Sequence, residues 1–180
     1  MTGTRPGGAS AGADRAGGGQ RVPGTGDADS RWLAEAVELS RRCPPSATAF
    51  SVGAILVAAD GGVIATGFSR ERDPHDHAEE IALAKAALPG SLPAAGGRRL
   101  AGATLYSSLE PCAARASRPR TCAELIIAAG LQRVVIAWLE PPVFVRGGGA
   151  ARLRAAGITV TEIPRLAPAA RAVNAHLLIS

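Results

Sequence analysis

Long apolar segments are missing from this sequence. No run of apolar residues approaches the roughly 20 that a membrane-spanning helix needs. The N-terminus also lacks the apolar core of a secretory signal, so we expect a cytoplasmic protein with no membrane partner. With 180 residues, 47% of them apolar, the chain can form one domain with a single core and is too apolar to be wholly disordered.

Cysteine, lysine and aromatic residues are also scarce. The three dispersed cysteines exclude a disulfide framework, and such cysteines with a histidine elsewhere more often indicate a metal or catalytic site. Lysine occurs once, at Lys85, so the net charge of +5 comes almost wholly from arginine. Aromatics make up 3% of the chain, and single-stranded nucleic acids are typically bound on basic surfaces with aromatic side chains. A nucleic-acid partner is therefore disfavoured, whereas a small anionic substrate beside a few arginines is not.

The chain divides near residue 30. Residues 1–29 are rich in Gly, Ala, Arg, Asp and Ser without periodicity, and we predict a disordered tail there. Residues 30–180 form the predicted domain. Ser30 is the predicted N-cap of its first helix, in which apolar residues from Trp32 to Leu39 recur at helical spacing and which stops at Pro44.

The remaining elements alternate in a way that predicts the fold class. Strands are predicted at 50–58, 63–67, 103–107, 134–137 and 158–162, and helices at 77–88, 121–129, 150–156 and 167–178. A hairpin followed by alternating helices and strands favours an α/β fold with one mixed five-stranded sheet and helices on both faces. The helix between the last two strands predicts that they run parallel.

Two segments carry candidate chemistry, and each leads into a helix. One is Asp76-His77-Ala78-Glu79-Glu80; the other runs from Glu110-Pro111-Cys112 through nine residues to Cys122. Asp76 with Glu79, and Thr121 with Glu124, have the spacing of a capping box, which predicts His77 and Cys122 at the first positions of two helices. The positive end of a helix dipole favours thiolate over thiol.

Two thiolates and one imidazole, from His77, Cys112 and Cys122, can form a three-ligand zinc site with an open fourth position, which is typical of catalytic sites. Glu79 is then the candidate for moving protons. Each residue alone has a simpler interpretation: Glu79 as a capping partner, His77 as a satisfied histidine, and the cysteines as small buried hydrophobes. Together, His-x-Glu followed by Pro-Cys and a second Cys is the signature of zinc deaminases.

On these motifs, residues 30 to about 165 resemble the cytidine-deaminase-like superfamily, and within it the riboflavin-pathway pyrimidine deaminases. The matching stretches are Ser51–Ala54, His77–Glu79, Thr104–Cys112, Cys122–Val135 and Ala155–Gly157. The resemblance implies a three-layer α/β/α sandwich, Zn²⁺ on His77, Cys112 and Cys122, Glu79 as proton shuttle, and a homo-oligomer. It also suggests that Ala78 contacts substrate.

The loop between the two cysteines carries the candidate substrate residues Arg115, Ser117, Arg118 and Arg120. Guanidinium groups suit phosphate oxygens, and we hypothesise that one or more of these arginines hold a substrate 5'-phosphate. The alternative is a solvated basic loop. The start of this loop resembles the fungal-type riboflavin deaminases, while Ala49-Phe50 departs from the Asn-Pro of the bacterial type.

The leading prediction is zinc-dependent hydrolytic deamination of the diaminopyrimidinone ribosylamino 5'-phosphate of riboflavin synthesis. The chain ends too soon for a reductase domain, so a separate reductase is expected. The alternatives are a cytosine-type nucleotide such as deoxycytidylate, a specialised pyrimidine, and a non-catalytic zinc scaffold, which Glu79 argues against. Among other polar residues, Asp73 and His75 are interpreted as pocket or turn residues, Glu80 as a surface residue, and Glu110 as a partner of the ligands or of a buried ion pair.

Overall fold

The computed structural model describes residues 1–3, 25–88, 100–141 and 147–178. Its centre is a five-stranded sheet in the order β2-β1-β3-β4-β5. The strands are β1 Gly53–Val57, β2 Val63–Phe68, β3 Thr104–Ser107, β4 Arg133–Ile136 and β5 Thr159–Glu162. Strand β1 is antiparallel to β2 and β3, whereas β3, β4 and β5 are parallel, so the predicted mixed sheet and the parallel final pair are confirmed.

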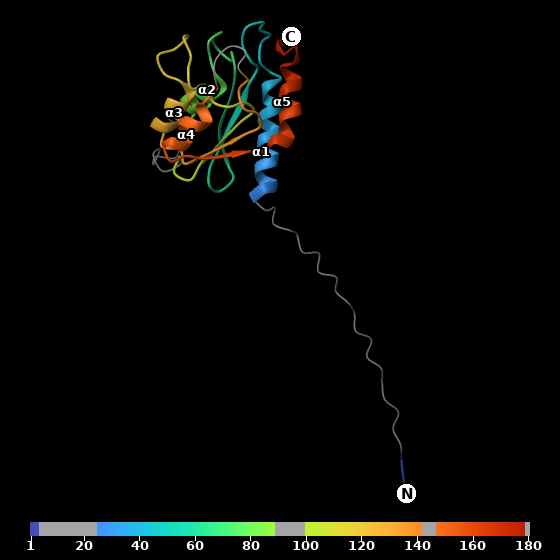
Figure 1. The fold of residues 1–180 in the computed structure, drawn as a ribbon. Helices are drawn as coiled ribbons and strands as arrows, with labels where there is room; N and C mark the ends of the chain where they lie inside the picture. Colours follow the sequence, from blue (N-terminus) through green and yellow to red (C-terminus); the bar gives the residue numbers. More distant parts are fainter. Residues whose placement is uncertain (4–24, 89–99, 142–146, 179–180) are drawn as a thin grey trace.

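Helices cover both faces of this sheet, which confirms the three-layer α/β/α sandwich. Figure 1 shows α1 (Thr25–Ser40) and α5 (Ala167–Val173) together on one side, and α2 (Ala78–Ala86), α3 (Cys122–Ala128) and α4 (Gly149–Ala155) gathered on the other. A short 3₁₀ turn at Pro164–Leu166 precedes α5, and another at Ala175–Leu177 follows it, so the predicted helix 167–178 ends early, at Val173. Among the described residues, no helix combines the length and apolarity needed to cross a membrane.

The first helix corrects the predicted boundary of the domain. It begins at Thr25, and Ser30 lies inside it rather than at its N-cap, with its hydroxyl donating to the carbonyl of Gly26. Asp29, predicted to be in the tail, is buried and paired with Arg133 at 2.6 Å. The first turns of α1 contain Gly, Asp and Ser, which have low helix propensity. The ion pair with Arg133, a residue distant in sequence, thus stabilises this part of the helix. The rest of the predicted tail, residues 4–24, lies outside the described residues.

Two glycines allow the close backbone contacts that place the functional helices. A Cβ on Gly67 would lie 2.3 Å from the carbonyl oxygen of Ala78, so only glycine lets β2 pack directly against the first turn of α2. A Cβ on Gly149 would lie 1.6 Å from the carbonyl oxygen of Pro111. Both contacts hold helix starts close to the edge where β3 and β4 end.

Candidate metal centre and its cavity

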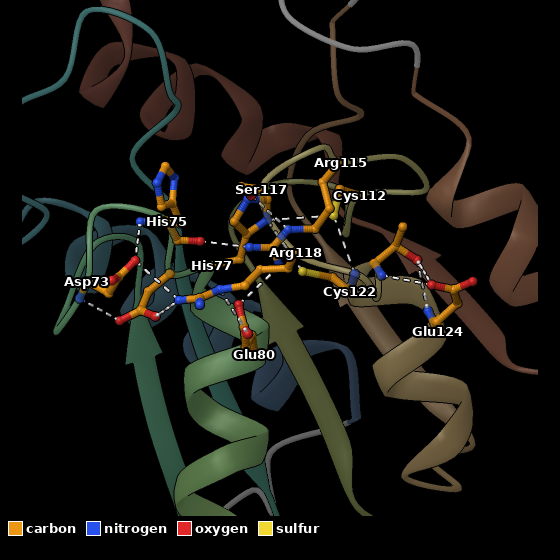
Figure 2. A network of polar contacts seen from close by, with 12 residues as sticks. Asp73, His75, His77, Glu80, Cys112, Arg115, Ser117, Arg118, Cys122 and Glu124 are labelled. Carbon is orange, nitrogen blue, oxygen red and sulfur yellow. Dashed lines mark hydrogen bonds and ion pairs between the residues drawn. The ribbon is translucent and has the colours of Figure 1, made fainter.

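The three predicted ligands come together at this edge of the sheet. The Nδ1 atom of His77 lies 3.6 Å from Sγ of Cys112 and 3.4 Å from Sγ of Cys122. A zinc ion with tetrahedral geometry, Zn–N near 2.05 Å and Zn–S near 2.3 Å, holds nitrogen and sulfur ligands about 3.6 Å apart. The donor set and its spacing therefore fit zinc, and Figure 2 shows the three side chains pointing toward one another.

His77 reaches this position from the N-cap of α2, not from its first turn. Its backbone is extended, with φ −99° and ψ 149°, and the cap has no side-chain hydrogen bond. The predicted capping box of Asp76 and Glu79 is therefore wrong. The Asp76 carboxylate instead accepts from the backbone N–H groups of Arg72 and Asp73, which folds the turn before α2. Glu79 is left free of a capping role.

The second predicted capping box is confirmed. Thr121 caps α3, its side chain accepts from the N–H of Glu124, and the Glu124 carboxylate accepts in return from the N–H of Thr121. Cys122 is consequently the first residue of α3, as predicted. Its backbone N–H donates to Sγ of Cys112 at 3.3 Å, so the start of the helix also fixes the other cysteine.

The two thiols perturb one another. The hydrogen bond from Cys122, together with His77 nearby, lowers the pKa of Cys112 to about 4. The same hydrogen bond, together with burial, raises the pKa of Cys122 well above its ordinary value. The pair therefore favours one thiolate and one thiol when the sulfurs have only these partners. A divalent cation between them supplies the positive charge that stabilises two thiolates.

Glu79 lies beside the ligands with its carboxylate inside the protein. It is 3% exposed, and its Oε1 accepts from the hydroxyl of Ser107, the last residue of β3, at 2.7 Å. Burial raises the pKa of Glu79, against the smaller opposing effects of His77 and Ser107. A carboxyl group with a raised pKa is suited to taking and returning a proton near neutral pH.

A cavity of about 550 Å³ opens onto these residues. Its volume is in the range of small-ligand sites. Four segments form its walls: residues 45–52, residues 69–79, residues 109–117 and Glu140. Phe50 contributes to one wall, and its ring packs edge-on against Trp138 with centroids 5.6 Å apart.

The arginine loop is bound mainly to acidic residues of the protein. Arg115 pairs with Glu80 at 3.0 Å and donates to the carbonyl of His75, while its side chain is 3% exposed. Arg118 pairs with Asp73 and Asp76, both at 3.2 Å (Figure 2). Glu80, interpreted from the sequence as a surface residue, is instead the partner that holds the loop. Asp73 shapes the turn, and His75 lines the cavity.

The other predicted substrate residues differ in position. Arg115 and Ser117 line the cavity, whereas Arg118, Arg120 and Ala78 are not among its lining residues. Arg120 is exposed and donates to the carbonyl of Glu124, and Ala78 is fully buried at the start of α2. The contacts described for these five residues do not test whether they bind substrate, so their roles in substrate binding stay predictions.

The Glu110 carboxylate hydrogen-bonds backbone groups, and among the described residues it contacts neither a predicted ligand nor a basic side chain directly. Its carboxylate accepts from the backbone N–H groups of Glu140, Gly148 and Ala150, at 2.9, 3.2 and 2.8 Å. It therefore ties the segment after β4 to the start of α4 and to the segment that carries Cys112. It makes no ion pair with a described residue.

Comparison with known proteins agrees with this geometry. The sequence model of one protein family, the cytidine and deoxycytidylate deaminase zinc-binding region, matches residues 27–138 of this chain. The chain belongs to this deaminase family. It is 38% identical over 131 residues to the diaminohydroxyphosphoribosylamino-pyrimidine deaminase of Schizosaccharomyces pombe, covering 73% of this chain and 31% of that protein. The matched region is the zinc-binding region of the family, and it contains the three residues that the structure brings together as possible ligands.

Solved structures of deaminases share the fold. The Aspergillus oryzae Rib2 deaminase in complex with DARIPP matches with a TM-score of 0.63 and 27% identity, over 76% of this chain and 84% of that one. Acinetobacter baumannii RibD matches with a TM-score of 0.65 and 32% identity, over 82% of this chain and 38% of that one. The chain thus spans about a third of the length of the curated relatives and of RibD.

Two residues of the site, Ser107 and Glu140, were not predicted from the sequence. Ser107 ends a buried strand, and two consecutive serines at that position in an apolar context are the only local sign of a polar function. Glu140 follows β4 by four residues and lines the cavity. Its place at the carboxyl edge of a parallel strand, where α/β proteins bind ligands, is the signal that points to it.

Proposed function

We propose that this protein deaminates a diaminopyrimidinone ribosylamino 5'-phosphate by hydrolysis. The observation that carries the proposal is the buried Glu79 carboxylate beside the three convergent ligands in a cavity of nucleotide size. The substrate follows from the relatives, whose names describe this pyrimidine and whose fungal member was solved with DARIPP. A metal scaffold without catalysis needs the ligands but not a buried carboxylate beside them.

The residues divide the chemistry as follows. His77, Cys112 and Cys122 would hold zinc, which supplies a water of lowered pKa when it is bound. Glu79 is placed to take a proton from the attacking water and to return protons to the ring nitrogen and to the departing amine. The C–N bond breaks, ammonia leaves, and the ring carbon keeps the water oxygen as a carbonyl. Ser107 positions the Glu79 carboxylate through its hydroxyl.

The phosphate hypothesis narrows to one arginine. Of the three arginines in the loop, Arg115 alone lines the cavity, and Ser117 lies beside it with its hydroxyl accepting from Nε of Arg115 at 3.2 Å. We propose that this pair contacts the substrate 5'-phosphate, with Glu80 holding the guanidinium in place. Three further predictions from the sequence also remain proposals: that the protein forms a homo-oligomer, that it works with a separate reductase, and that it is located in the cytoplasm.

Ammonia release tests the proposed function. Purified protein with its zinc quantified is given the diaminopyrimidinone nucleotide and deoxycytidylate in parallel, and the expected result is release from the first. Release from deoxycytidylate alone would contradict the proposed substrate and support the cytosine-type alternative. No release from either, with one zinc bound per chain, would contradict the proposed substrate class.

A further inference from the structure

Glu140 occupies a distinctive position in the cavity. It follows β4 and lines the cavity together with Glu79, which lies in α2, and Cys112, which lies after β3. Its backbone N–H donates to the Glu110 carboxylate at 2.9 Å, and the N–H of Glu110 donates to the carbonyl of Trp138 at 2.8 Å. These paired contacts fix the backbone that carries the Glu140 side chain.

Among the acidic groups that line the cavity, Glu140 is the one with a buried carboxyl oxygen that has no hydrogen-bond partner in the part of the chain that the structure describes. Asp76, Glu79 and Glu110 each accept hydrogen bonds from protein groups. The Oε2 atom of Glu140 is buried and has no hydrogen-bond partner among the described residues. Burial raises the pKa of Glu140 to about 8, with Cys112, Glu110 and Glu79 adding to the effect.

A buried carboxyl oxygen without a partner is costly, and a ligand that supplies a donor removes that cost. A phosphate would be repelled by this cluster of carboxyl groups. Glu140 shares its part of the cavity with Glu79 and Cys112, where the reacting ring must be bound, so a donor on the ring fits this position better than a ribose hydroxyl does. The proposed substrate has a ring amino group next to its carbonyl, at a position where cytosine has only hydrogen. That amino group is a donor, and it is not the amine that leaves.

We propose that Glu140 recognises this second, retained amino group and thereby selects a 5-aminopyrimidine over a cytosine-type ring. The inference rests on the proposed function. Glu140 takes no part in the proton transfers, which belong to Glu79. It acts as a specificity residue. Two carboxyl groups from different elements would then contact the ring: Glu79 in α2 and Glu140 after β4.

Equilibrium binding to the zinc-loaded protein tests the inference without turnover. The ligands are the deamination product, 5-amino-6-(5-phosphoribosylamino)uracil, and the same nucleotide without its 5-amino group, both titrated by calorimetry. The wild-type protein is expected to prefer the amino form by about 10- to 100-fold, as for one hydrogen bond to a buried carboxyl group. Glu140→Met, which keeps the side-chain volume without an acceptor, is expected to bind both ligands equally.

Glu140→Gln retains an acceptor oxygen and is expected to recover most of the preference. Glu162→Gln serves as the matched control, because Glu162 lies on β5, pairs with Arg154 and does not line the cavity. An unchanged preference in Glu140→Met, with normal zinc content and melting temperature, would overturn the inference while ammonia release by the wild type upheld the proposed function. Absence of that release would count against the proposed function itself. If Glu140→Met does not fold, equal binding of both ligands by the wild type overturns the inference.

Discussion

The metal centre and the arginine loop lie side by side, and their side chains behave in opposite ways. His77, Cys112 and Cys122 come from three separate positions in the chain, and their ligand atoms converge within 4.8 Å of one another. None of the three makes an ion pair with an acidic or basic side chain in the part of the chain that the structure describes. The arginines that follow Cys112 are mostly bound by acidic residues, with Arg115 on Glu80 and Arg118 on Asp73 and Asp76. The first arrangement is open to a cation, whereas most of the charge in the second is already satisfied within the protein.

This difference shows which sequence signals can be trusted. Short side chains such as Cys and His reach a metal only from fixed backbone positions, so their spacing predicts the site. An arginine side chain is long and flexible, and the partner it finds depends on distant residues. Glu80, 35 residues before Arg115, accepts a hydrogen bond from its guanidinium group and so fixes the position of that arginine.

Removal of a ligand has the largest expected effect. Cys122→Ser should lose zinc and all measurable deamination, because two remaining protein ligands do not hold the ion tightly. Metal content by mass spectrometry and ammonia release measure both losses. Cys43→Ser is the control, since Cys43 donates to the carbonyl of Val52 away from the ligands, and it should keep both properties. Full activity in Cys122→Ser would refute the ligand assignment.

Loss of the proton shuttle comes next. Glu79→Gln should lower kcat by about 10²- to 10⁴-fold, the usual contribution of general acid–base catalysis, while one zinc per chain stays bound. Ser107→Ala should have a smaller effect and shift the pH profile, because the hydroxyl that steadies the Glu79 carboxylate is lost. Steady-state kinetics with zinc analysis measures both. Normal turnover in Glu79→Gln would exclude the assigned role.

The two kinds of loop arginine should differ in their effect on substrate binding. Arg115→Ala should raise KM for the nucleotide by about 10-fold or more and leave KM for the nucleoside nearly unchanged, as expected for a lost charge-assisted phosphate contact. Arg120→Ala, at an exposed position outside the cavity, should change either KM by less than about 2-fold. Equal effects of Arg115→Ala on nucleotide and nucleoside would contradict the phosphate contact.

The smallest expected effect lies far from the site and concerns stability. The hydrogen bond from Arg133 lowers the pKa of Asp29 below its ordinary value of 3.8. Because the folded pKa is the lower one, this stabilisation is complete above about pH 5 and is lost as the pH falls through the folded pKa. Asp29→Asn should lower the free energy of unfolding by about 1–2 kcal/mol at pH 7, and by progressively less below pH 4. Urea unfolding at pH 7 and pH 3 measures it, and an equal loss at both would contradict the assignment.

The fold and the ligands were largely predictable from the sequence. Hydrophobic periodicity and turn residues predicted the five strands, and the connecting helix predicted that the last two run parallel. The deaminase signature predicted His77, Cys112 and Cys122 as ligands and Glu79 beside them. The start of α1 at Thr25 was not predictable, since Asp29 is stabilised by Arg133, 104 residues away. The capping role of Asp76 also failed, because its carboxylate had two nearer backbone donors.

The most direct test of the metal centre is X-ray absorption at the zinc edge of the purified protein. The assignment of two cysteines and one histidine predicts two sulfur atoms near 2.3 Å and lighter ligands near 2.0–2.1 Å, one of them from water or substrate. Cys122→Ser, loaded with zinc in excess, should lose one of the two sulfurs. A wild-type spectrum with only nitrogen and oxygen ligands would contradict the account.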